Sequence, residues 1–249
     1  MDEYRIAIEA AKAAGEYLEN NYNISVDSQF DKDIKLAADK SSERIIIDIL
    51  ANTGYTIMSE ETGVIKGNRN DKTWIVDPLD GSANYWKGMK ELSCTSIALW
   101  EGNTPILGVV YRFNKDEMYS GIVGEGAWLN GKSIETSSVD NTKDAVFATG
   151  FPVKRDYSSD KLEKFIRQVQ NFKKVRMLGA AAVMGSFVAS GKVDAYIEEQ
   201  IMLWDIAASS AIVKAAGGVV DIELLGDDQC ICKLFANKSL YSSYLELGE

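Results

Sequence analysis

The chain has 249 residues, 46% of them hydrophobic and only three of them proline, which is enough for one large globular domain or two small lobes with an ample core. Its formal net charge of −10 argues against nucleic-acid binding through a basic surface, and its lack of histidine excludes Ser-His-Asp, Cys-His and His-ligated zinc chemistry. Carboxylate and hydroxyl chemistry remains, and it suits hard, oxygen-seeking ions such as Mg2+.

The ends and the cysteines favour a cytoplasmic location. The N-terminal residues Met1 to Arg5 lack the basic start and apolar block of a signal peptide, and no apolar run approaches membrane-spanning length. Cys94, Cys230 and Cys232 show no Cys-x-x-Cys spacing, which favours buried, reduced thiols. We therefore expect neither a membrane nor a nucleic acid as a partner.

The first half of the chain reads as two helices followed by strands. Apolar spacing predicts amphipathic helices over residues 3–20 and from about Ala38 to Leu50, separated by a polar loop over 27–35. A short strand over 55–58 and a charged loop over 66–72 follow. The later β-like segments and turn signals predict an antiparallel sheet that helices must cover, with strands over 93–100, 105–113 and 117–123 and a hairpin over 124–131.

The second half alternates between strands and helices. Strands are predicted over 145–149, 193–197 and 219–222, and helices over 159–171, 180–190 and 206–216. Such alternation predicts an α/β layer. The composition shifts near 137–143 without a flexible linker, so we expect a single domain over 1–249 with sub-lobes 1–138 and 139–249.

The stretch from Trp74 to Ser82 stands out. Trp74, Ile75 and Val76 predict a buried strand that Pro78 ends, which places Asp77 at the strand's exit and Asp80 in the turn. Gly81 and Ser82 then offer backbone N–H groups at a helix start, where an anion can be held. The alternative is an ordinary strand–turn–helix junction with aspartates at capping and turn positions.

Other carboxylates occupy similar places. Glu60 and Glu61 close the strand before this stretch, and Asp205 precedes the helix over 206–216. Strand ends and helix starts gather at one edge of an α/β layer, so three to five carboxylates could hold two or three Mg2+ ions that activate water and neutralise phosphate. The alternatives are a solvated Glu60–Glu61 pair and a helix N-cap at Asp205.

Three separated motifs resemble those of the inositol monophosphatase family, a group of magnesium-dependent, lithium-sensitive phosphatases. Ser59-Glu60-Glu61 resembles the family's Gly-Glu-Glu element, and Trp204-Asp205-Ile206-Ala207-Ala208 resembles its Trp-Asp-Val-Ala-Ala-Gly signature with Ser209 in place of the glycine. The stretch from Asp77 to Tyr85 resembles Asp-Pro-Ile/Leu-Asp-Gly-Thr-x-Asn-Phe, with Ser82 for Thr and Tyr85 for Phe. The resemblance runs nearly end to end and implies a layered αβαβα sandwich of the α/β (α+β) class.

The resemblance also implies roles for single residues. Glu60, Asp77 and the Leu79 carbonyl would hold one metal ion, while Asp77, Asp80 and Asp205 would hold a second, and Glu60 could share a third. Phosphate would lie on these ions and on the amides of Gly81 and Ser82. Asp39, paired with the Ser82 hydroxyl, would orient and deprotonate the attacking water, so that Asp39, Ser82 and Glu60 form the catalytic group.

The substrate is less closely defined. Glu198, Gly179 and Ala180 match positions that line the polyol pocket in inositol-directed members, although Glu198 could equally be a surface charge. A small polyol phosphate such as inositol-1-phosphate is favoured, and fructose-1,6-bisphosphate and 3′-phosphoadenosine 5′-phosphate stay open, with Arg176 as the one candidate for a second phosphate. A catalytically silent metal-binding regulator is the alternative from another class. Homodimers are usual among such proteins.

Overall fold

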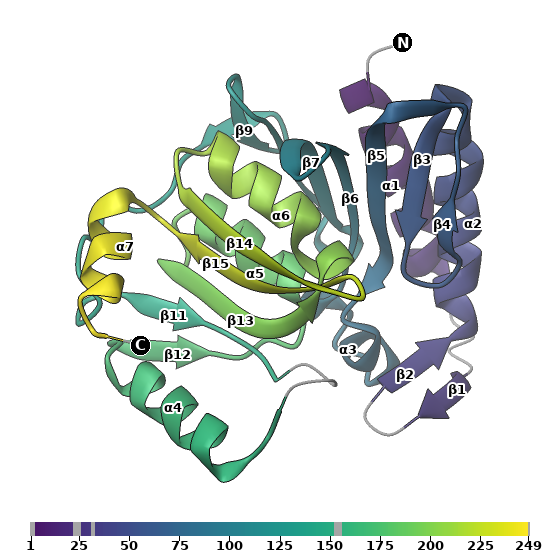
Figure 1. The fold of residues 1–249 in the computed structure, drawn as a ribbon. Helices are drawn as coiled ribbons and strands as arrows, with labels where there is room; N and C mark the ends of the chain where they lie inside the picture. Colours follow the sequence, from purple (N-terminus) through teal and green to yellow (C-terminus); the bar gives the residue numbers. More distant parts are fainter. Residues whose placement is uncertain (1–2, 22–25, 31–32, 152–155, 249) are drawn as a thin grey trace.

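Two large β-sheets alternate with three layers of helices in the computed structural model, which describes residues 3–21, 26–30, 33–151 and 156–248 (Figure 1). The helices are α1 (Glu3–Asn20), α2 (Ala37–Leu50), α3 (Ser82–Trp86), α4 (Ser159–Gln170), α5 (Ala181–Ala189), α6 (Leu203–Ala215) and α7 (Lys238–Leu245).

The first sheet has eight strands in the order β10-β9-β8-β7-β6-β5-β3-β4. They are β3 (Tyr55–Ser59), β4 (Gly63–Ile65), β5 (Arg69–Asp80), β6 (Cys94–Glu101), β7 (Thr104–Arg112), β8 (Glu117–Ile122), β9 (Gly126–Leu129) and β10 (Lys132–Ile134). All neighbouring pairs are antiparallel except β3 and β5, which run parallel, so the sheet is mixed rather than purely antiparallel as predicted.

The second sheet has five strands in the order β12-β11-β13-β15-β14 and is also mixed. Its strands are β11 (Val146–Ala148), β12 (Lys174–Arg176), β13 (Ala195–Met202), β14 (Val219–Gly226) and β15 (Gln229–Phe235). The chain passes from the first sheet to the second between Ile134 and Val146, where the composition shift was noted.

Three apolar clusters hold the layers together. α1 and α2 bury Leu18 and Ile46 on one face of the first sheet, while α5 and α6 fill the space between the sheets with small side chains and aliphatic ones such as Ile206. Leu240 and Tyr244 of α7 pack on the outer face of the second sheet. Small residues such as Ala182 and Ala208, both fully buried, let the inner helices approach both sheets closely.

Several predicted elements differ from the observed ones. Pro78 does not end β5, because the ladder to β6 shifts register between Asp77 and Asp80, and the missing proline N–H is tolerated at such an irregularity. The predicted polar loop instead holds β1 (Val26–Phe30) and β2 (Asp33–Leu36), paired antiparallel, with residues 31–32 outside the described ranges. The sequence of this ribbon lacks the apolar alternation from which a strand is predicted.

The predicted hairpin over 124–131 is displaced. β9 pairs with both β8 and β10, and the tight turn lies at Asn130 and Gly131, whose φ angles are 50° and 76°. Positive φ at both central residues is the type I′ geometry that Asn-Gly favours. Within the described ranges, no helix combines the length and the apolar composition that crossing a membrane requires.

Candidate active site

The end of β5 carries two buried aspartates on a tightly anchored backbone. Asp77 and Asp80 are only 2% and 7% exposed, and the Asp77 Oδ1 atom accepts a hydrogen bond of 3.0 Å from the Leu79 N–H. The Pro78 carbonyl between them accepts hydrogen bonds from the Ser42 hydroxyl of α2 and the Thr95 hydroxyl of β6, at 3.0 and 3.3 Å. The sheet and a helix therefore fix the aspartates on both sides.

Asp80 also connects this segment to the inner helix layer. Its Oδ1 and Oδ2 atoms accept hydrogen bonds from the N–H groups of Ala181 and Ala182 at the start of α5, at 3.2 and 2.8 Å. The N-cap residue Ala180 has no side-chain acceptor, so Asp80 satisfies amides that would otherwise be buried without partners. Burial raises the pKa of Asp80 to about 6, although these hydrogen bonds act to lower it.

Asp77, Asp205 and Glu60 repel one another in a poorly solvated region. Burial, followed by the charges of Glu60 and Asp80, raises the pKa of both Asp77 and Asp205 well above the ordinary range. Glu60 is linked to β5 by its N–H, which donates to the Val76 carbonyl at 3.3 Å. The sequence motifs thus predicted which acidic groups lie within electrostatic range of each other.

This group of carboxylates has a deficit of positive charge. Asp77, Asp80 and Asp205 form no ion pair with any Lys or Arg among the described residues. No three acidic, cysteine or histidine side chains in the described ranges are arranged as a ready coordination cluster. The carboxylates of Asp77, Asp80 and Asp205 are oxygen donors, the first two of them buried, and such donors nevertheless fit hard divalent cations, because the cations remove the repulsion between them.

Asp39 and Ser82 come together beside the aspartates. Asp39 is 3% exposed in the first turn of α2, where its Oδ2 accepts a hydrogen bond of 2.6 Å from the Leu36 N–H. The Ser82 hydroxyl lies 3.4 Å from the Asp39 Oδ1 and 3.0 Å from the Leu79 carbonyl oxygen. The structure therefore brings Asp39, Leu79 and Ser82 into one hydrogen-bonded group, although the Asp39–Ser82 contact is long.

Gly81 occupies a position that no other residue fills easily. Its φ of 85° lies in the left-handed region, and a Cβ there would lie 2.8 Å from the Leu92 carbonyl oxygen and 3.1 Å from the Ala180 Cβ. The Asn84 side chain fixes the surrounding loops, because its Nδ2 donates to the Leu178 and Leu92 carbonyls at 2.8 and 2.9 Å. Gly179 and Ala180 are thereby held next to Gly81.

Glu198 is not a surface charge, which corrects that alternative. It is 6% exposed on β13, and its Oε2 accepts a hydrogen bond of 2.7 Å from the Tyr196 hydroxyl. Its charge contributes to the raised pKa of Asp205, so the two carboxylates face a shared region. Asp205 lies in the first turn of α6, which begins at Leu203, so it is not the N-cap of that helix.

Arg176, the candidate for a second phosphate, lies exposed on β12. Its guanidinium donates to the carbonyl of its neighbour Val175 at 2.9 Å. Among the described residues, no hydrogen bond or ion pair joins its side chain to the carboxylate group or to Glu198. The structure therefore gives no observation that favours a bisphosphate site here.

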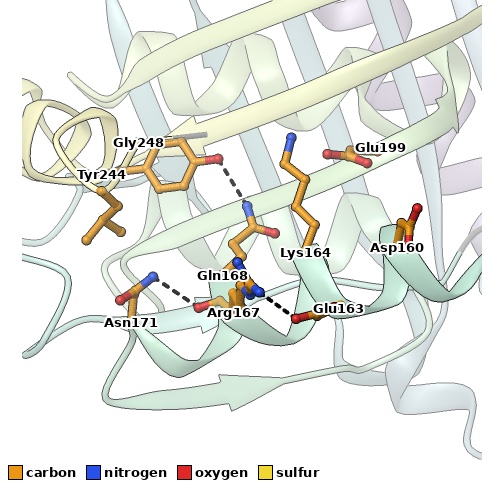
Figure 2. Close-up of a pocket in the computed structure, with 10 residues that line it drawn as sticks. Asp160, Glu163, Lys164, Arg167, Gln168, Asn171, Glu199, Tyr244 and Gly248 are labelled. Carbon is orange, nitrogen blue, oxygen red and sulfur yellow. Dashed lines mark hydrogen bonds and ion pairs between the residues drawn. The ribbon is translucent and has the colours of Figure 1, made fainter.

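A separate pocket of about 500 Å³ lies between α4 and α7 and contains none of the predicted site residues (Figure 2). Within it Arg167 pairs with Glu163, and the Gln168 side chain donates to the Tyr244 hydroxyl at 3.1 Å. It therefore offers no chemistry beyond that of a solvated surface hollow.

Three residues near the site escaped the sequence reasoning. Asn84 lies inside the central motif, so its position there was a usable signal. Cys94, whose thiol donates to the Asp80 Oδ2 at 3.6 Å, meets it through the register of β5 and β6, which a single sequence does not reveal. Tyr196, which donates to Glu198, lies two residues before it on the same face of β13, so that spacing was a usable signal.

Comparisons with known proteins agree with this geometry. The sequence model of the inositol monophosphatase family matches residues 2–223. The Nus factor SuhB of Pasteurella multocida is 34% identical over 222 residues, covering 86% of this chain and 83% of that protein, and the inositol-1-monophosphatase of Mesorhizobium japonicum is 32% identical over a similar span.

The fold agrees as well. The structure of inositol monophosphatase from Anabaena superimposes with a TM-score of 0.85 at 30% identity, covering 98% of this chain and 94% of that one. The extragenic suppressor protein suhB from Bartonella henselae gives a TM-score of 0.86 at 28% identity, covering 98% of both chains. By sequence and by fold, the chain belongs to the inositol monophosphatase family.

Proposed function

We propose that this protein is a magnesium-dependent phosphomonoesterase that hydrolyses a small polyol phosphate such as inositol-1-phosphate. The observation that carries the proposal is the group formed by Glu60, Asp77, Asp80 and Asp205, in which mutual repulsion and burial oppose the charged state. Bound cations would remove this repulsion, and perturbed carboxylates of this kind are typical of functional sites.

The donors divide into overlapping sets. Glu60, Asp77 and the Leu79 carbonyl would hold one Mg2+ ion, and Asp77, Asp80 and Asp205 a second, with Glu60 shared by any third. When bound, such ions neutralise phosphate charge, acidify water and stabilise the leaving oxygen. Asp80 would also keep its hydrogen bonds from the Ala181 and Ala182 amides, so the start of α5 holds this donor in place.

Asp39 and Ser82 would manage the proton of the attacking water. The buried Asp39 carboxylate is fixed by the Leu36 amide, and the Ser82 hydroxyl lies between it and the Leu79 carbonyl. A water that donates to Ser82 could pass its proton toward Asp39 without any histidine. The Gly81 and Ser82 amides at the start of α3 would hold the phosphate oxygens.

The polyol would lie toward the inner helix layer. Gly179 and Ala180 are next to Gly81, and the buried Glu198 carboxylate lies within electrostatic range of Asp205. The Glu198 carboxylate accepts a hydrogen bond from the Tyr196 hydroxyl, and such an acceptor suits the hydroxyl groups of a sugar or cyclitol. This placement favours a polyol phosphate over a bisphosphate, which would need a second cationic group.

Two further expectations accompany the proposal. The family resemblance leads us to expect a homodimer, whose mass analytical ultracentrifugation would measure. A cytoplasmic location is the second expectation. The relatives named Nus factors raise the alternative of a regulatory role without turnover. That alternative predicts loss of a catalytic group, whereas Asp39, Ser82 and all four carboxylates are present.

The test is phosphate release from four esters, with and without Mg2+, by the wild-type protein and by Asp77→Asn. The esters are inositol-1-phosphate, fructose-1,6-bisphosphate, 3′-phosphoadenosine 5′-phosphate and glycerol-2-phosphate. We expect Mg2+-dependent turnover, highest on inositol-1-phosphate and abolished by the substitution. A folded wild-type protein that binds Mg2+ but releases phosphate from none of them would refute the proposal and leave the regulatory alternative.

A further inference from the structure

Strand β6 places two side chains directly opposite the aspartates of β5. In the β5–β6 ladder Asp80 is paired with Cys94, and Asp77 is paired with Ser96. Side chains of paired residues project from the same face and lie close together. β6 therefore offers one hydrogen-bonding group to each aspartate.

The two pairs differ in one respect. The Cys94 thiol donates a hydrogen bond to the Asp80 Oδ2 at 3.6 Å, so its donor is used. The Ser96 hydroxyl is buried, with 1% of the residue exposed, and it has no hydrogen-bond partner among the described residues. A buried hydroxyl without a partner is unfavourable and uncommon in folded proteins, so this one needs an explanation.

Strand alternation shows which way Ser96 points. Cys94 and Ala98, two residues before and after it, belong to the apolar cluster between the sheets, whereas Ile97 and Leu99 belong to the cluster under α1 and α2. Ser96 therefore projects to the same side as Cys94, toward the layer of α5 and α6. Asp205 lies on that side too, in the first turn of α6, and raises the pKa of Asp77.

We propose that Ser96 is a positioning residue whose hydroxyl bonds to the hydration water of a divalent cation held by Asp77 and Asp205. The inference rests on the proposed function. Mg2+ retains several waters in protein sites, and those waters need partners from groups just outside the ligands. Ser96 is a donor and an acceptor placed for this purpose, and it has no other use in the described part of the chain.

This role predicts an unusual pattern for Ser96→Ala. The metal-free protein should melt at the same temperature as the wild type or slightly above it, because the substitution removes a hydroxyl that had no partner. Its affinity for Mg2+, measured by titration calorimetry on the EDTA-treated full chain, should fall roughly tenfold, at the low end of the loss seen for residues that support metal ligands. The thermal stabilisation by Mg2+ should shrink accordingly.

Ser59→Ala is the matched control. Ser59 is a fully buried serine at the end of β3, also without a partner among the described residues, but it shares its face with Ile57 of the cluster under α1 and α2. Its removal should leave Mg2+ affinity within a factor of two. Ser96→Thr, which keeps the hydroxyl, should bind Mg2+ as the wild type does.

The outcomes separate this inference from the function it rests on. If the wild type itself shows neither Mg2+ binding nor turnover, the proposed function fails. If the wild type binds Mg2+ and Ser96→Ala binds it equally well, only the role of Ser96 is refuted. A Ser96→Ala protein that loses stability without metal, or a Ser59→Ala protein that loses the same affinity, would also refute it.

Discussion

Gly81→Ala tests the placement of the backbone that follows the aspartates. The positive φ of 85° costs an alanine about 1–2 kcal/mol, which the reduced entropy of the unfolded chain offsets by about 0.4–1 kcal/mol. The new Cβ would also lie 2.8 Å from the Leu92 carbonyl oxygen, and overpacking of this kind costs about 1–3 kcal/mol. We expect a net loss of roughly 1–4.5 kcal/mol in the free energy of unfolding.

Gly88 offers a matched control in the same region. Its φ is 80°, but no heavy atom lies within 4 Å of the Cβ that an alanine would place there. Gly88→Ala should therefore cost about 1 kcal/mol or less, since only the backbone contribution remains. The difference between the two variants isolates the crowding at Gly81.

Urea unfolding of the EDTA-treated proteins, followed by tryptophan fluorescence, measures both free energies, provided that the m-values stay equal. Mg2+-dependent turnover should fall by about a hundredfold in Gly81→Ala, because a displacement of this backbone moves the Ser82 group. Equal stability of the two variants within about 0.5 kcal/mol would refute the crowding argument. Full turnover in a destabilised Gly81→Ala would refute the placement of phosphate on this loop.

Two further predictions concern the substrate side and the metal-free state. Gly150→Ala would place a Cβ 2.6 Å from the Glu198 Oε2 and so displace that carboxylate. KM for inositol-1-phosphate should then rise roughly tenfold while Mg2+ affinity stays constant. An unchanged KM would contradict a polyol role for Glu198. In EDTA the free energy of unfolding should fall as pH rises from about 4 to 7. The reason is that the pKa of Asp80 is raised to about 6, so this group binds more protons in the folded than in the unfolded state. Saturating Mg2+ should abolish this fall. Urea titrations that show no fall across that range would contradict a pKa of Asp80 raised by burial.

Local patterns predicted much of the fold because they report burial directly. Helix α1 matches its predicted range of 3–20, and α2 begins one residue before its prediction, since apolar spacing marks the buried face of each. β1 and β2 escaped prediction because a polar ribbon carries no such spacing. Pro78 misled for another reason: a proline interrupts a strand only where its N–H is needed, and the register shift after Asp77 removes that need.

The sequence proposes the candidate site as a set of residues but not as a set of contacts. The central motif points to Asp77, Asp80 and Ser82, the family resemblance adds Asp39, and the structure places Asp39 within 3.4 Å of Ser82. The contacts of Asp80 with α5 cross 101 and 102 residues of chain, and no local pattern encodes pairing over such a distance. Strand register likewise decided which residues of β6 face the aspartates.

Asp80 shows why this site and the inner helix layer depend on each other. The carboxylate provides the acceptors that the first amides of α5 need, and α5 in turn packs Val183 and Met184 into the cluster between the two sheets. Removing Asp80 would therefore leave the first amides of α5 buried without acceptors, as well as removing a proposed metal donor. Removing Asp77 would leave only the Leu79 amide without its acceptor and would remove a buried charge that Glu60 repels. A loss of turnover in Asp80→Ala thus combines two causes, and Asp77→Asn is the cleaner test of metal chemistry.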